Sequence, residues 1–167
     1  MKLAASLATI AGALALQTTL TAYVRETSSL DFVLIVVVYL SLTSGPTTGV
    51  LAGTAAGLIQ DALSSGVMGI GALAKTIVGF AAGRVGTQFI VTAPLPRFVV
   101  FIGASLLHAA IFIGLYVLLG LRQFSNPWPV VAGQAVGNAV VGVVGFQVLE
   151  WLPGFLQRRR MGRPIRR

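Results

Sequence analysis

Two ionisable residues, Asp61 and Lys75, lie in the mostly apolar, glycine-rich stretch from Gly49 to Gly86. An acid and a base at this spacing could form an ion pair, line a partner-binding cavity, or hold a ligand or a proton. Either charge at the centre of a membrane helix costs about 2.5 to 3.5 kcal/mol on insertion scales, so each must find a partner, water or the interface. Because a tight turn separates the two residues, we expect an ion pair that fixes a helix hairpin, with the other two roles as alternatives.

Each charge continues a row of small residues spaced four apart, which places each row on one face of a helix. Small residues let helix backbones approach closely in lipid. We therefore expect the two rows to be partner-binding or structural surfaces. The rows consist of Gly49, Gly53 and Gly57 ahead of Asp61, and of Gly79 and Gly83 behind Lys75.

The other polar residues within apolar segments favour structural roles. Asp31 opens an apolar run, where its carboxylate can accept hydrogen bonds from the free N–H groups of the first helical turn. His108, the single histidine, is expected to make a packing or hydrogen-bond contact between helices rather than to act as a base. For Gln134 and Asn138, interhelical hydrogen bonds are preferred to ligand binding.

No catalytic centre, metal site or cofactor site is predicted. The chain has one His and no Cys, too few ligands for a multi-histidine or thiolate metal site. The sequence also lacks paired carboxylates, a nucleophile beside a base and a phosphate-binding P-loop motif. The sequence therefore indicates a protein that binds rather than one that turns over a substrate.

Composition indicates an integral membrane protein. Of the 167 residues 56% are hydrophobic and only 10% are charged, whereas about a quarter are charged in a soluble domain. The net charge of +8 fits anionic lipid better than nucleic acid, because the basic residues lack interleaved aromatic residues that would stack on bases.

Apolar runs and turn residues predict an all-α, six-span transmembrane bundle over residues 1–152, followed by a basic cytoplasmic tail over residues 153–167. The third span is short enough to be partly re-entrant. The first span carries small residues four apart, Ala4, Ala8 and Gly12, which predict a helix-docking face. The spans are 3–23, a run from Asp31 that Ser44-Gly45-Pro46 ends, 47–62, 67–86, 98–121 and 130–151.

The distribution of basic residues predicts the orientation. Six spans place both termini on one side, and with that side cytoplasmic nine Lys and Arg residues lie inside. Only Arg25 and Arg122 lie outside, and Lys75 is left out because it lies within a span. This bias follows the positive-inside rule and predicts that both termini are cytoplasmic.

The central part of the chain resembles the rod shape-determining protein MreD family of bacteria. The resemblance covers about fifty residues in order and spacing, and the rest agrees in size, span count and basic tail. The matching residues are Asp31 ahead of a Val/Ile/Leu-rich helix, Gly45-Pro46, Ala52-Gly53, Ala56-Gly57-Leu58, Gln60-Asp61-Ala62-Leu63-Ser64, Gly69, Ala72-Leu73 and Lys75-Thr76-Ile77-Val78-Gly79-Phe80.

The resemblance implies a non-enzymatic scaffold of the cell-wall elongation complex in the bacterial inner membrane, which regulates peptidoglycan synthesis. Its direct partner would be an MreC-like single-span protein. Through that partner it would act indirectly on the RodA glycosyltransferase, a penicillin-binding transpeptidase and MreB filaments. We expect exposed small-residue grooves to accept the partner's transmembrane helix, with the hairpin of Asp61 and Lys75 forming one wall.

The family is also similar in fold to the substrate-binding subunits of energy-coupling-factor vitamin transporters, and this similarity supplies an alternative function. The face of Ala4, Ala8 and Gly12 would then dock a transporter subunit. A vitamin pocket needs several convergent polar groups. The short external loops, residues 25–30, 63–66 and 122–128, argue against such a pocket.

Overall fold

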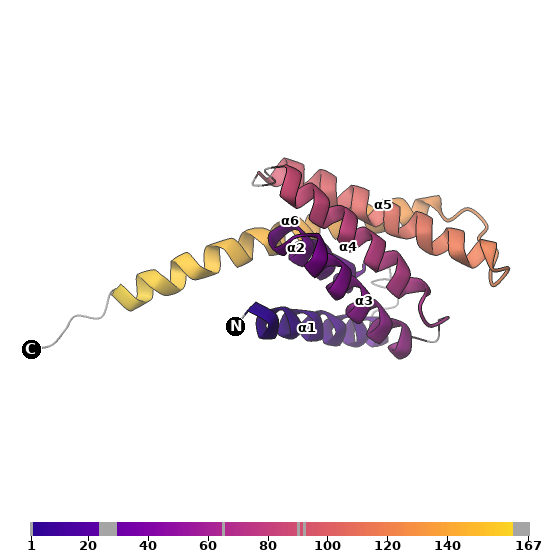
Figure 1. Cartoon of the computed structure of the whole chain (residues 1–167), viewed down its shortest axis with the longest axis horizontal. Helices are drawn as coiled ribbons and strands as arrows, with labels where there is room; N and C mark the ends of the chain where they lie inside the picture. The colour runs from indigo at the N-terminus through magenta and orange to yellow at the C-terminus, as the bar shows by residue number, and fades with distance from the viewer. Residues whose placement is uncertain (1, 24–29, 65, 90, 92, 162–167) are drawn as a thin grey trace, which may run out of the picture.

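The structure is a computed structural model that describes residues 2–23, 30–64, 66–89, 91 and 93–161. Within these ranges the chain forms six α-helices and no strand, which confirms the all-α prediction (Figure 1). The helices are α1 (Lys2–Tyr23), α2 (Phe32–Ser44), α3 (Pro46–Leu63), α4 (Ile70–Gln88), α5 (Pro94–Leu118) and α6 (Trp128–Met161).

The short helix α2 is the centre of the bundle and contacts each of the other five helices. It has only 13 residues, and because it is apolar on all sides it can be surrounded by other helices. One apolar cluster joins it to α4, α5 and α6, and a second joins it to α1 and α3. Asp31 caps its first turn by accepting a hydrogen bond from Leu34 N at 2.9 Å, which confirms the predicted capping role.

Helices α2 and α3 are joined by the single residue Gly45. Its φ of 88° lies in the left-handed region that favours glycine. Pro46 follows at the start of α3, where its missing N–H would have no helical partner in any case. The chain therefore reverses with almost no loop and returns alongside α2.

The glycine rows of α3 and α4 pack against each other. A Cβ atom on Gly49 would clash with the carbonyl oxygen of Gly79, and one on Gly53 would clash with the carbonyl of Lys75. The hydroxyls of Thr54 and Thr76 also hydrogen bond across this interface at 2.8 Å. The two helices therefore approach as closely as their backbones allow.

This packing corrects the expectation of an open small-residue groove on the hairpin. Gly49, Gly53, Gly57, Gly79 and Gly83 are all buried within the bundle. Because each row covers the other, neither is free to receive a helix from a partner. These five glycines have a structural role.

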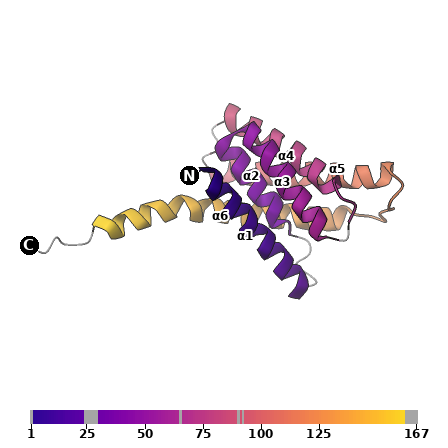
Figure 2. The same ribbon diagram turned by 60° about the horizontal axis from the view of Figure 1, so that its bottom comes forward.

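Among the described residues, two helices are long and apolar enough to cross a membrane, judged by length and composition: Pro94–Leu118, which is α5, and Trp128–Trp151 in α6. Ser6–Leu20 and Phe32–Ser44 are shorter apolar helices. Helix α6 continues to Met161 and projects away from the bundle (Figures 1 and 2). The predicted tail from residue 153 thus begins within α6, and residues 162–167 lie outside the described part of the chain.

Helix α1 lies on one face of the bundle, where its helix contacts among the described residues are with α2 and α3 (Figure 2). Ala4, Ala8 and Gly12 are exposed. A Cβ atom on Gly12 would have no neighbour within 4 Å. The predicted docking face is therefore open, in contrast to the buried glycine rows of α3 and α4.

Candidate functional site

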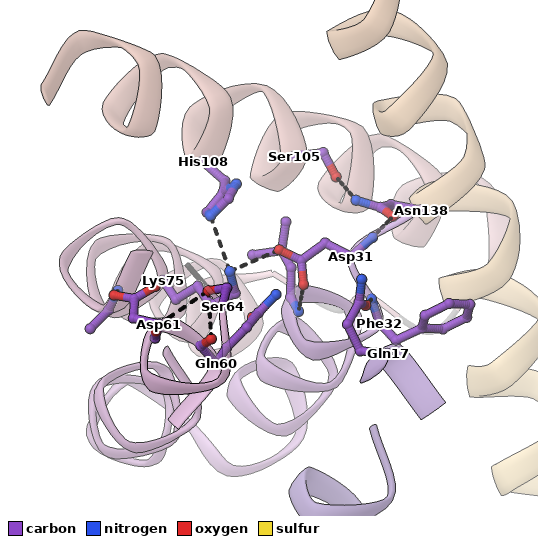
Figure 3. A network of polar contacts seen from close by, with 12 residues as sticks. Gln17, Asp31, Phe32, Gln60, Asp61, Ser64, Lys75, Ser105, His108 and Asn138 are labelled. Carbon is purple, nitrogen blue, oxygen red and sulfur yellow. Dashed lines mark hydrogen bonds and ion pairs between the residues drawn. The ribbon is translucent and has the colours of Figure 1, made fainter. Parts of the chain in front are cut away.

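The Lys75 side chain joins three helices inside the bundle (Figure 3). Its Nζ lies 2.8 Å from Oδ2 of Asp31, at the start of α2, and 3.2 Å from Nε2 of His108, on α5. An ammonium group can only donate, so Nε2 of His108 must accept and the ring is uncharged, with its proton on Nδ1. The exposed fractions of Lys75 and Asp31 are 3% and 5%, so the pair is shielded from solvent.

The predicted ion pair between Asp61 and Lys75 is wrong. Oδ2 of Asp61 accepts hydrogen bonds from the backbone N–H of Gly69 at 2.8 Å and of Ala72 at 3.1 Å. The first N–H groups of a helix have no helical acceptor, and the helix dipole favours a negative charge beside them. Asp61 therefore stabilises the start of α4, while Lys75, further along α4, reaches the carboxylate of α2.

A chain of amide and hydroxyl groups extends from Asp31 to α5 and α6. Asp31 N donates to Oδ1 of Asn138 at 3.0 Å, and Nδ2 of Asn138 donates to Oγ of Ser105 at 3.1 Å. Asn138 is fully buried, so these bonds satisfy an amide that would otherwise destabilise the core. The predicted interhelical role is confirmed for Asn138, whereas Gln134 lines a cavity.

Helix α1 binds the same turn of α2 through Gln17. Its Nε2 donates to the carbonyl oxygen of Leu30 at 2.9 Å, and its Oε1 accepts from Phe32 N at 2.8 Å. Residues of α1, α4 and α6 therefore all bind the first turn of α2 (Figure 3). Sequence reasoning missed Gln17, although a glutamine in an apolar span is a signal for such a contact.

The predicted contact role of His108 is confirmed by its bond to Lys75 and by its stacking on Phe112, with ring centroids 5.8 Å apart. In the part of the chain that the structure describes, no group of three His, Asp or Glu residues could hold a metal ion. His108 therefore belongs to a buried polar network.

A second ion pair joins α5 and α6. Nη2 and Nη1 of Arg97 lie 2.6 Å and 2.9 Å from the two carboxylate oxygens of Glu150. The guanidinium also donates from Nε to the carbonyl oxygen of Val91 at 3.1 Å and lies 3.9 Å from the ring centroid of Phe146. The sequence did not predict this pairing.

A cavity of about 650 Å³ lies between the α3–α4 connection and the α5–α6 connection. Its buried residues include Asp31, Lys75 and His108, and its exposed residues include Arg122. Short external loops were expected to disfavour a pocket with convergent polar groups, but the protein has such a cavity. The ends of the helices, rather than long loops, supply the polar groups.

Comparison with known proteins gives one family. The family model described as rod shape-determining protein MreD matches residues 3–150. No curated protein and no solved structure matches the chain.

Proposed function

The chain belongs to the MreD family, whose model covers residues 3–150, and from this membership we propose that it is a non-enzymatic scaffold of the cell-wall elongation complex. Membership of this family identifies the chain as a membrane protein with a role in determining rod shape. In the proposal, the protein lies in the bacterial inner membrane and regulates peptidoglycan synthesis by binding an MreC-like single-span partner. Through that partner the protein acts indirectly on RodA, a penicillin-binding transpeptidase and MreB filaments.

The exposed face of α1 supports a specific binding mode. The glycine rows of α3 and α4 are covered, whereas Ala4, Ala8 and Gly12 form an open row on α1. In lipid, such a row lets another helix approach closely and gain dispersion energy. We place the transmembrane helix of the MreC-like partner on this face.

The proposed topology has six spans and both termini in the cytoplasm. It is supported by the nine-to-two distribution of basic residues and the positive-inside rule. The basic residues that follow Trp151 would then face the anionic lipid of the inner leaflet.

Co-purification of the MreC-like partner from detergent tests this function. We expect Gly12→Leu to reduce recovery of the partner strongly, because the larger side chain separates the two helices. The matched control is Gly103→Leu on α5, since neither glycine has a neighbour within 4 Å of a Cβ position. Full recovery with both variants would reject α1 as the binding face, and failure of the unmodified protein to retain the partner would reject the scaffold function.

One observation favours the alternative function, a vitamin-transporter subunit: the cavity gathers several polar side chains. On that alternative, native mass spectrometry of the purified protein would detect a retained vitamin. We prefer the scaffold because the family match is to shape-determining proteins.

A further inference from the structure

We propose that the cavity between the two connections binds a small uncharged ring compound that carries hydroxyl or amide groups, of the size of an acetylated aminosugar or its disaccharide. This site is separate from the face of α1 that we assign to the partner helix. The inference rests on the size, charge balance, unpaired polar groups and aromatic wall of the cavity.

The size of the cavity suits a small molecule. Its volume of about 650 Å³ lies within the range of about 300 to 1,000 Å³ that is typical of ligand sites. The walls come from α3, α4, α5, α6 and the α3–α4 and α5–α6 connections, and the buried pair of Asp31 and Lys75 contributes to the lining. A site built from several helices is largely pre-formed, as ligand sites usually are.

The charges that line the cavity balance. Asp31 and Asp61 are the two acids, and Lys75 and Arg122 are the two bases, while His108 is uncharged as an acceptor from Lys75. Asp31 already pairs with Lys75, and Asp61 already accepts two backbone hydrogen bonds. The remaining charge, Arg122, is exposed at the edge of the cavity. A ligand with a net charge would therefore find no unpaired counter-charge in the buried part of the cavity and would lose its hydration there, so the lining favours an uncharged ligand.

Two side chains in the lining have unused hydrogen-bonding capacity. Oε1 of Gln60 is buried and has no hydrogen-bond partner, which is uncommon for a buried acceptor. The Tyr116 oxygen accepts from Val67 N at 3.3 Å, so its own proton is still available for donation. A ligand that both donates and accepts, as hydroxyl and amide groups do, would satisfy both.

Aromatic side chains form one wall of the cavity. The ring centroids of Phe112 and Tyr116 are 4.8 Å apart, and those of Tyr116 and Phe124 are 6.2 Å apart. His108 continues this series toward Lys75. Such a wall offers apolar contact to the face of a ring while the polar groups bind its edge. A sugar ring has this combination of C–H faces and hydroxyl-bearing edges.

Tryptophan fluorescence provides a direct binding assay. The chain has two Trp residues, so Trp151→Phe leaves Trp128 as the single reporter, next to the cavity residue Pro127. The protein in lipid nanodiscs is titrated with N-acetylglucosamine and with its β-1,4-linked disaccharide. We expect a saturable fluorescence change, with tighter binding of the disaccharide because it fills more of the cavity.

Variants locate the binding within the cavity. Gln60→Leu should weaken binding at least about fivefold, because it removes the unpaired acceptor. Gln88→Leu is the matched control, since Gln88 is exposed and lies outside the cavity lining. If Gln60→Leu does not fold, Tyr116→Phe removes only one hydroxyl and should also weaken binding, whereas Tyr39→Phe, outside the lining, should not.

A charged analogue tests the charge balance. N-acetylmuramic acid is N-acetylglucosamine whose 3-hydroxyl carries a lactic acid group in ether linkage and hence a carboxylate, and it should bind more weakly. Tighter binding of the acid, or of the cationic vitamin thiamine, would overturn the inference. So would the absence of saturation by both neutral sugars up to about 50 mM, a concentration well above millimolar dissociation constants. These outcomes do not depend on the partner, so they are distinguishable from failure of the scaffold function.

Discussion

Replacing Lys75 by Met should strongly destabilise the protein. The substitution leaves the Asp31 carboxylate, only 5% exposed, without its counter-charge, and it removes the donor to His108. Loss of one partner of a buried pair typically costs about 3 to 5 kcal/mol in the free energy of unfolding. At about 2 to 4 °C per kcal/mol for a chain of this size, the unfolding midpoint should fall by roughly 6 to 20 °C.

Thermal unfolding followed by circular dichroism in one detergent measures this effect. Arg84→Met is the matched control, because Arg84 is an exposed base on the same helix, and it should change the midpoint little. The double variant Asp31→Asn, Lys75→Met should recover much of the loss, since no buried charge then remains unpaired. An unchanged midpoint for Lys75→Met, or a double variant no more stable than the single one, would refute the assignment of the buried pair.

Three further predictions concern other parts of the structure. Gly49→Ala should lower the unfolding midpoint more than Gly103→Ala, because overpacking at the α3–α4 contact costs about 1 to 3 kcal/mol while Gly103 has open space; equal midpoints would contradict the contact. Asp61→Ala should lower the free energy of unfolding by about 1 kcal/mol, as the loss of a helix cap does. A fall in the midpoint as large as that of Lys75→Met in the same assay would instead support an ion pair between Asp61 and Lys75. A single Cys at Ser125 should react with an impermeant maleimide in spheroplasts, and protection there but not in lysed cells would reverse the proposed orientation.

The six helical segments could be predicted because apolar runs and turn residues mark them, but several boundaries could not, among them the starts of α4 and α5. Helix α4 was predicted to begin at Val67 and begins at Ile70, after Gly69 adopts a φ of 100°. Helix α5 was predicted to begin at residue 98 and begins at Pro94. Proline is tolerated in the first turn of a helix because its missing N–H needs no helical acceptor.

The pairing of the charges could not be predicted, because it depends on contacts between helices that are distant in sequence. The sequence assigned Asp31 to the cap of α2, and this is confirmed. However, a carboxylate has two oxygens: Oδ1 accepts from Leu34 N, while Oδ2 pairs with Lys75. The short turn between Asp61 and Lys75 suggested that these two residues pair. Instead, Asp61 accepts hydrogen bonds from backbone N–H groups at the start of α4, so Lys75 pairs with Asp31.

The cavity could not be predicted from loop lengths, since helix ends build it. Individual lining residues were visible as polar positions in apolar segments, among them His108 and Gln134. Their convergence depends on the packing of α4, α5 and α6 around α2. No local pattern in the sequence encodes that arrangement.

The polar contacts of the first turn of α2 also constrain the order in which the protein can assemble during synthesis. Asp31 N is bound by Asn138, 107 positions later in the chain, and the Asp31 carboxylate is bound by Lys75. When α2 has left the ribosome, Asn138 has not been made, although the N-terminal part of a chain can begin to fold before synthesis ends. The first helices must therefore enter the membrane with this turn still hydrated or bound by the insertion machinery. The bond to Asp31 N becomes possible only with the arrival of α6, so chains truncated before Asn138 should be substrates for quality-control proteases.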